Sequence, residues 1–202
     1  MSKSPWLLYE YQPAFVIGFH GCDAVIGEGI LAGTIKHLDP SRKKWDWLGH
    51  GLYFWEGNPQ RALEWARERA ITGSITTPFV LGAIIDLKHC LDLLDSSGLQ
   101  LVQDAHATLA ASYAAVGIPL PRNRVGKDKA ARTLDCLVIN SLHKFITKRR
   151  LPRYQSVRAM FPEGDELYHD AGFKDKNHIQ LCIRDNTCIK GYFRPIMNGL
   201  AS

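Results

Sequence analysis

One apolar run near the middle of the chain constrains the fold more than any other feature. Residues 79–87 are almost entirely apolar and include β-branched side chains. A run of this length and composition predicts a strand that is buried on both faces of a sheet. Residues 15–20 alternate between two sets of side chains, which predicts a second strand with a wide hydrophobic face.

Helix signals surround these strands. Asp23 is a typical N-cap and predicts a short helix over residues 24–31. Asn58 followed by Pro59 marks the start of a second helix, which continues over residues 60–70. Two longer helices are predicted, one from the alanine-rich residues 97–116 and one from the amphipathic pattern of residues 129–145.

Further strands are predicted towards both ends of the chain. They cover residues 51–55, 178–184 and 188–193, and the last two are expected to form a hairpin through Asp185-Asn186-Thr187. Residues 161–177 are rich in Gly and Asp and predict a long loop. The mixture of helices and strands predicts an α+β fold in one domain over residues 1–202.

The composition is that of a globular protein. Of 202 residues, 46% are hydrophobic and 22% are charged, so disorder is not expected. Five cysteines without a Cys-x-x-Cys pair favour free thiols in a reducing compartment, and we expect the cytoplasm. The sequence contains neither a membrane-length apolar segment nor zinc-ligand spacing, so we expect neither a membrane span nor a metal.

Positive charge is concentrated in one segment. Between Arg122 and Arg158 there are 11 Lys or Arg against 2 Asp or Glu, a local charge of +9 within a chain of net +5. The segment is either a solvated basic face or a surface for a polyanion. Tyr154 and Phe161 lie among these cations and are either base-stacking or core residues. The residues expected to contact nucleic acid are Lys148, Arg149, Arg150 and Arg153.

Two short motifs near the N-terminus have a specific order and spacing. His20-Gly21 ends the first apolar strand, and Gly51, Tyr53 and Phe54 form an aromatic strand that is followed by a helix. Each motif alone is weak, because a single histidine or tyrosine in a strand is usually a structural residue. Glycine permits close backbone approach, and an aromatic ring offers a face for a flat cation.

Together these motifs resemble the NAD-binding segments of the ADP-ribosyltransferase superfamily, in its poly(ADP-ribose) polymerase-like branch. The resemblance implies a split pair of curved sheets around an NAD cleft, flanked by helices, and release of nicotinamide from NAD. It implies that His20 donates a hydrogen bond to a ribose hydroxyl and that Gly21 pairs with the nicotinamide amide. It also implies that Gly51 and Tyr53 form the stacking segment, with Trp65 as a second aromatic. Residues 98–158 have no counterpart and are expected to form a helical, basic insertion.

The third element of that family, a glutamate on a later strand, is replaced here. The best match is residues 177–183, where Gln180 falls on the face opposite Ile179 and Leu181. A glutamine oxygen accepts a hydroxyl hydrogen bond but supplies no negative charge. Either Gln180 works with His20 and Tyr53, or an acid of the preceding loop supplies the charge, with Glu163 favoured over Asp165 and Glu166.

The expected activity is therefore transfer of a single ADP-ribose from NAD to a macromolecular acceptor, and the basic segment favours a nucleic acid as that acceptor. The family context suits a bacterial or phage toxin or defence effector, with an antitoxin or immunity protein as partner. Two alternatives stay open. One is an inactive transferase-fold module that binds nucleic acid, and the other is a transferase that modifies proteins.

Overall fold

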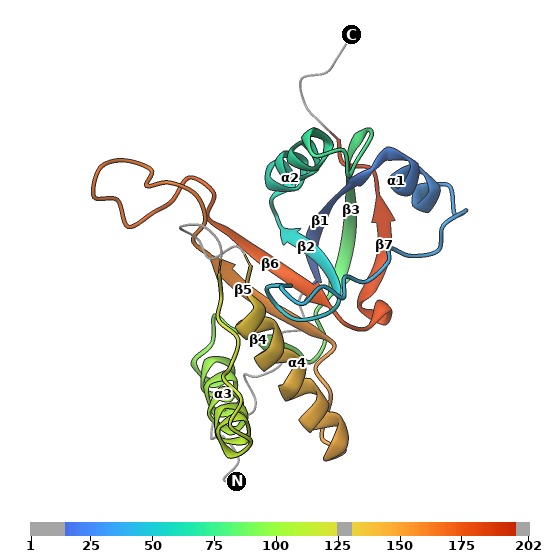
Figure 1. Ribbon diagram of the computed structural model, residues 1–202. Coiled ribbons are helices and arrows are strands. Elements are labelled where there is room, and N and C mark those ends of the chain that lie inside the picture. The colour runs from blue at the N-terminus through green and yellow to red at the C-terminus, as the bar shows by residue number, and fades with distance from the viewer. Residues whose placement is uncertain (1–14, 125–130, 197–202) are drawn as a thin grey trace.

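A computed structural model describes residues 15–124 and 131–196, and these form one mixed sheet with helices at its two ends (Figure 1). The sheet has seven strands in the order β4-β5-β6-β2-β1-β3-β7, and only β4 and β5 pair in parallel. The strands are β1 (Phe15–Asp23), β2 (Leu52–Glu56), β3 (Pro78–Asp86), β4 (Cys90–Asp92), β5 (Ser156–Phe161), β6 (His178–Ile183) and β7 (Ile189–Phe193). This confirms an α+β fold.

The expected pair of separate sheets is instead one hydrogen-bonded sheet with a narrow middle. β1 and β2 pair through only Gly18 with Glu56 and Phe19 with Trp55. By contrast, β1 and β3 pair over their full length of nine residues. Figure 1 shows β5 and β6 running at a clear angle to β1, β3 and β7. The two halves of the sheet are thus joined only briefly, and they separate beyond the join.

The expected hairpin at the C-terminal end is wrong. β6 lies between β5 and β2, whereas β7 pairs with β3 at the far edge of the sheet. The short helical turn η2 (Asn186–Cys188) connects them, and the Asp185 carboxylate accepts a hydrogen bond from the Thr187 backbone N–H. A turn signal predicts a change of direction but not which strands pair, because several strands offer similar apolar partners.

The helices confirm the local signals. The Asp23 side chain caps α1 (Ala24–Leu31) by accepting from Val25 N at 3.1 Å. The Asn58 side chain caps α2 (Pro59–Ile71) by accepting from Arg61 N at 3.0 Å. The two longer helices are α3 (Ser96–Ala115) and α4 (Thr133–Lys148). The predicted start of the last helix at residue 129 lies outside the described residues. Residues 131 and 132 are not helical, contrary to the prediction, and α4 ends three residues later than expected.

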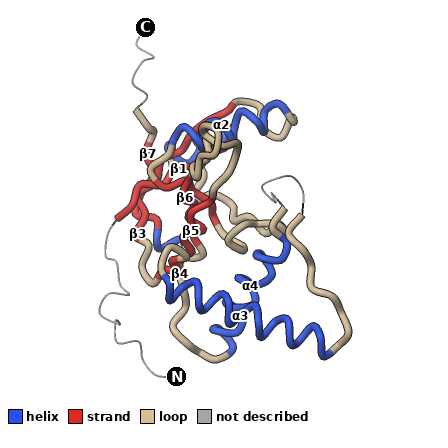
Figure 2. The backbone as a smooth tube through the Cα atoms, turned by 90° about the vertical axis from the view of Figure 1, so that its left-hand side faces the viewer, coloured by secondary structure: helices blue, strands red, loops and turns tan. Residues whose placement is uncertain are grey.

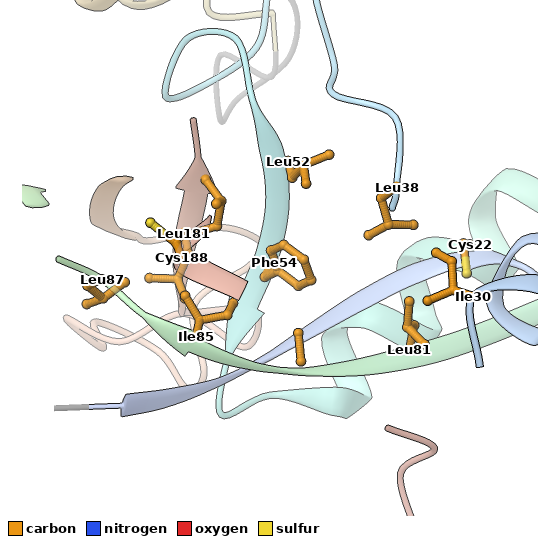
Figure 3. Packing of buried hydrophobic residues seen from close by; sticks show 12 residues of the cluster. Cys22, Ile30, Leu38, Leu52, Phe54, Leu81, Ile85, Leu87, Leu181 and Cys188 are labelled. Atoms are coloured by element: carbon orange, nitrogen blue, oxygen red, sulfur yellow. The ribbon is translucent and has the colours of Figure 1, made fainter. Parts of the chain in front are cut away.

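Two apolar clusters form the core. In the first, Phe54, Leu81, Ile85 and Leu181 are fully buried between the strands, as Figure 3 shows. This cluster covers one face of β3 only, because Ile84 on the other face is 39% exposed. The prediction that this strand is buried on both faces is therefore wrong at that position.

The second cluster packs α4, which lies in the basic segment, against β5 of the sheet. Ile139, Leu142 and Ile146 of α4 pack with Val157 and Phe161 of β5. Figures 1 and 2 place α3 and α4 together at one end of the molecule, with α2 at the other. Residues 98–158 contain most of α3, all of α4 and the first three residues of β5. Phe161, at 5% exposure, is a core residue and not a base-stacking one.

No helix in residues 15–124 or 131–196 is both long enough and apolar enough to cross a membrane.

Candidate functional site

A cavity of about 680 Å³ lies where β1 and β2 separate. Binding pockets for small molecules commonly range from about 300 to 1,000 Å³. Six residues singled out from the sequence line this cavity, although they come from five separate segments: His20, Gly51, Tyr53, Trp65, Glu163 and Gln180. The fold therefore brings the three motifs to one place.

His20 bridges the gap between the separating strands. Its Nδ1 lies 2.7 Å from the backbone carbonyl oxygen of Tyr53. Burial lowers the pKa of His20, so the neutral ring is the stable form. A carbonyl oxygen can only accept, so the neutral ring carries its proton on Nδ1 and leaves Nε2 as an acceptor. We expected His20 to donate to a ribose hydroxyl, but this bonding makes it the acceptor of that bond.

Tyr53 uses its hydroxyl to hold the preceding loop. The hydroxyl donates to Gly49 O at 2.6 Å and accepts from Leu48 N at 2.8 Å. Burial raises the pKa of Tyr53 well above its usual value, so the phenol stays protonated. Tyr53 lines the cavity, and two hydrogen bonds at its hydroxyl hold its ring in place. A fixed ring is suited to stacking, because no side-chain freedom is lost on binding.

Tryptophan side chains make this cavity strongly aromatic. Four of the five tryptophans of the chain line it: Trp45, Trp47, Trp55 and Trp65. The rings of Trp55 and Trp65 lie 5.9 Å apart, and the Arg69 guanidinium covers the Trp65 ring at 5.2 Å. Trp65 thus lines the cavity as predicted. Trp45 and Trp47 were missed, because the loop that carries them has no periodic pattern.

Gln180 lies on the predicted face of its strand. On β6, Leu181 and Ile183 enter the first core cluster, while Gln180 lines the cavity. The alternation of side chains along a strand is sufficient to produce this arrangement. Trp55 is its pairing partner on β2, so the amide lies beside the aromatic wall.

Glu163 also reaches the cavity, where it meets a cation that the sequence did not reveal. Arg61 of α2, only 5% exposed, donates to Glu163 at 3.1 Å and to Glu64 at 2.6 Å. His178 lies 3.6 Å from the same Glu163 oxygen. The two other loop acids, Asp165 and Glu166, are exposed and do not line the cavity. Glu163 is thus the loop acid at the site, although Arg61 partly neutralises its charge.

Three further acids line the cavity and were missed, of which Asp39 and Glu68 are exposed and Asp46 is buried. Asp46 is 9% exposed and accepts hydrogen bonds from Ser41 Oγ and Lys43 N, both at 2.8 Å. Burial raises the pKa of Asp46 despite these bonds. Its position two residues before Leu48, in a loop with no strand or helix pattern, left no signal in the sequence.

Gly21 has a packing role that the sequence did not reveal. It does not line the cavity, and a Cβ at this position would lie 2.3 Å from the carbonyl oxygen of Ala62. The absence of a side chain lets α2 pack directly on β1. Gly51 lines the cavity, yet a Cβ there would lie 2.5 Å from Cys182 Sγ. Close packing of elements therefore explains both glycines.

The basic residues expected to bind nucleic acid lie at the C-terminal end of α4 and just beyond it. Lys148 ends α4, and Arg149, Arg150 and Arg153 follow it, all exposed. None of the four lines the aromatic cavity. The predicted donor and acceptor sites are thus spatially distinct.

The cysteines provide no nucleophile at the site. All five are free thiols. Burial raises the pKa of Cys22 to about 11 and that of Cys182 to about 12, so both remain protonated. Within residues 15–124 and 131–196, no three His, Cys, Asp or Glu side chains are grouped so that they could hold a metal ion.

No family model and no curated protein matches the sequence, and no solved structure matches the fold.

Proposed function

We propose that the protein is an ADP-ribosyltransferase that uses NAD as donor and transfers one ADP-ribose to a macromolecule. One observation carries the proposal: one cavity is lined by the five residues that the sequence predicts for this chemistry, namely His20, Tyr53, Trp65, Glu163 and Gln180. These residues are up to 160 positions apart in the chain, so chance proximity is a poor explanation.

The aromatic wall suits the donor. NAD carries two flat ring systems, of which the nicotinamide is cationic, and aromatic faces attract such rings. Tyr53 supplies a ring held by two hydrogen bonds, and Trp65 of α2 is a second aromatic residue that lines the cavity. The unprotonated Nε2 of His20 accepts a hydrogen bond from a ribose hydroxyl, and the Gln180 amide oxygen accepts a second.

The reaction exchanges one bond at the ribose. The bond between ribose C1′ and the nicotinamide nitrogen breaks, and its electron pair leaves with nicotinamide. A lone pair of the acceptor forms the new bond to C1′, and the acceptor proton passes to water. Positive charge develops on the ribose between these events, so a nearby negative charge stabilises the transition state.

Glu163 and Asp46 are the candidates for that charge. Gln180 has none. Glu163 lies 3.1 Å from Arg61, and the Arg61 charge partly offsets its field. Asp46 is held in place by two hydrogen bonds, and burial raises its pKa. We favour Glu163, because Asp46 directs its oxygens to its own loop.

The acceptor we propose is a nucleic acid, because 11 of the chain's 25 cations lie between Arg122 and Arg158. Free thiols suit a cytoplasmic location. A small transferase of this kind suits a toxin or defence effector that is restrained by an antitoxin or immunity protein.

The test is incubation of the protein with NAD labelled in the adenosine half, with and without a cell lysate. The expected result is release of nicotinamide and label in a fraction that is sensitive to nuclease and resistant to protease. Label that is sensitive to protease would assign a protein acceptor. Absence of both nicotinamide release and transfer would support the inactive module, which the uncharged Gln180 favours.

A further inference from the structure

A second cavity, of about 630 Å³, runs along α4. One face of that helix forms its floor, with residues three or four positions apart: Thr133, Cys136, Leu137, Asn140, Lys144, Thr147 and Lys148. The opposite face of α4 is buried in the second core cluster. Lys44, His50 and Arg184 from other segments complete the walls.

The walls of this cavity are positively charged. Four of its twelve lining residues are Lys or Arg, and none is Asp or Glu: Lys44, Lys144, Lys148 and Arg184. Three are exposed lysines at the rim, whereas Arg184 is half-buried. Like charges gathered around a concave surface raise the local concentration of anions.

Arg184 is the deepest of these charges and lacks a counter-charge. Its Nη1 donates to the His50 carbonyl oxygen at 2.8 Å and lies 3.4 Å from Asn140 Oδ1. Both partners are neutral, and Arg184 forms no ion pair within the described parts of the chain. A half-buried guanidinium without a carboxylate loses hydration and gains little in return. An anion in the cavity restores the missing interaction.

His143 adds a second unsatisfied group. Its side chain lines the cavity and is 8% exposed, and Nε2 has no hydrogen-bond partner among the described residues. Buried polar atoms in folded proteins almost always have a partner. An oxygen-rich ligand in the cavity would supply one.

We propose that this cavity binds a phosphate group of a nucleic-acid strand. Arg184 supplies the planar fork that matches phosphate oxygens. Lys144 and Lys148 are one turn apart, about 6 Å along the helix axis, and contact the neighbouring phosphates. Arg149 and Arg150 are exposed just beyond Lys148 and extend the same path.

The position of the cavity deepens the proposed function, on which its role as an acceptor site rests. Lys43 and Gly51 line the aromatic cavity, whereas their chain neighbours Lys44 and His50 line this one. The loop from 43 to 51 is thus a wall shared by both cavities. A strand held along α4 would pass beside the predicted NAD site.

The test measures binding without NAD, so its outcome is independent of any transferase activity. A fluorescent single strand of about 16 nucleotides, as RNA and as DNA, is titrated with the full chain at several salt concentrations. The variant Lys144→Glu/Lys148→Glu changes two exposed side chains. Its control, Lys36→Glu/Arg67→Glu, makes the same change of net charge at exposed positions outside both cavities.

The expected result is binding that weakens at least about tenfold in the Lys144/Lys148 variant and much less in the control. The slope of log affinity against log salt should fall by about 1.4, the value for two lost single-strand phosphate contacts. Arg184→Gln should weaken binding while thermal melting shows a folded chain. If Arg184→Gln does not fold, the comparison of the Lys144→Glu/Lys148→Glu variant with its control tests the proposal.

Three outcomes would overturn the proposal. One is absence of strand binding by the wild-type chain at low salt. Another is equal weakening in the lysine variant and its control, which would show a general charge effect. The third is displacement of the strand by AMP or inorganic phosphate at the same phosphate concentration, which would assign the cavity to a free phosphate compound.

Discussion

His20 Nδ1 lies 2.7 Å from the carbonyl oxygen of Tyr53, and this hydrogen bond links β1 to β2 beyond the point where the strands stop pairing. Had the ladder continued, Gly21 would face Tyr53, since Phe19 pairs with Trp55. The side chain of His20 thus takes up a carbonyl that the separating strands would leave free. The same contact orients the ring at the cavity.

His20→Ala should reduce nicotinamide release by about 100- to 1000-fold, the usual loss for one transition-state hydrogen bond. It should also cost about 1 kcal/mol of folding stability, because one side-chain hydrogen bond is lost. The matched control is His89→Ala. His89 Nδ1 also bonds a carbonyl oxygen, that of Arg153 at 2.9 Å, but lies outside the cavity. Equal turnover in the two variants would remove His20 from the site.

Gln180→Ala should lower nicotinamide release by about 100- to 1000-fold, because the amide oxygen is lost at the ribose. Glu163→Gln should have a similar effect if Glu163 stabilises the developing positive charge. Turnover measured at saturating NAD separates loss of catalysis from loss of binding. Full activity of Glu163→Gln combined with inactivity of Asp46→Asn would transfer the electrostatic role to Asp46.

Arg61 and Glu163 should be energetically coupled. A double-mutant cycle with Arg61→Gln and Glu163→Gln, measured by urea unfolding, should give about 1 to 3 kcal/mol, because Arg61 is almost fully buried. The exposed pair Lys176 and Glu68 is the control and should give about 0.2 to 1 kcal/mol. No coupling in the first cycle would mean that the loop of Glu163 is not held by α2.

Gly21→Ala should destabilise the protein by about 1 to 3 kcal/mol, because the new Cβ would lie 2.3 Å from Ala62 O. Gly191→Ala on β7, where a Cβ meets nothing within 4 Å, should change the free energy of unfolding by less than about 0.5 kcal/mol. If Gly21→Ala folded as stably as the wild type but failed to bind NAD, a direct ligand role for Gly21 would be the better explanation.

Acid should destabilise the protein through His143. Burial, with a further contribution from the Arg184 charge, lowers the pKa of His143 to about 3 from 6.5. Between these values the unfolded chain binds a proton that the folded chain does not, so stability falls as pH drops below 6.5. The slope is about 1.4 kcal/mol per pH unit for one proton.

His143→Phe should therefore make unfolding less sensitive to pH. The free energy of unfolding of wild type and variant is measured by urea titration from neutral pH to pH 4. His20 and His178 also have lowered pKa values, so more than one histidine contributes to the pH dependence of the wild-type free energy of unfolding. The difference between the two profiles should grow as pH falls, and parallel profiles would contradict the assignment.

The sequence by itself determined the local elements and most of the candidate site. Asp23 and Asn58 mark helix starts, because their side chains satisfy free backbone N–H groups wherever the helix lies. Alternation along β6 placed Gln180 opposite Leu181, because successive side chains of a strand point to opposite faces. These rules act over a few residues, so they need no knowledge of the fold.

Only the tertiary structure decided what those elements meet. Strands β6 and β7 are neighbours in the chain, yet three other strands separate them in the sheet. Arg61 and Glu163 meet across 102 positions, and Arg184 reaches the loop of His50 across 134. Strand pairing and burial depend on the total packing of the chain, in which many apolar edges compete on similar terms. A short motif therefore predicts a residue's chemistry, whereas the folded chain selects the partners that surround it.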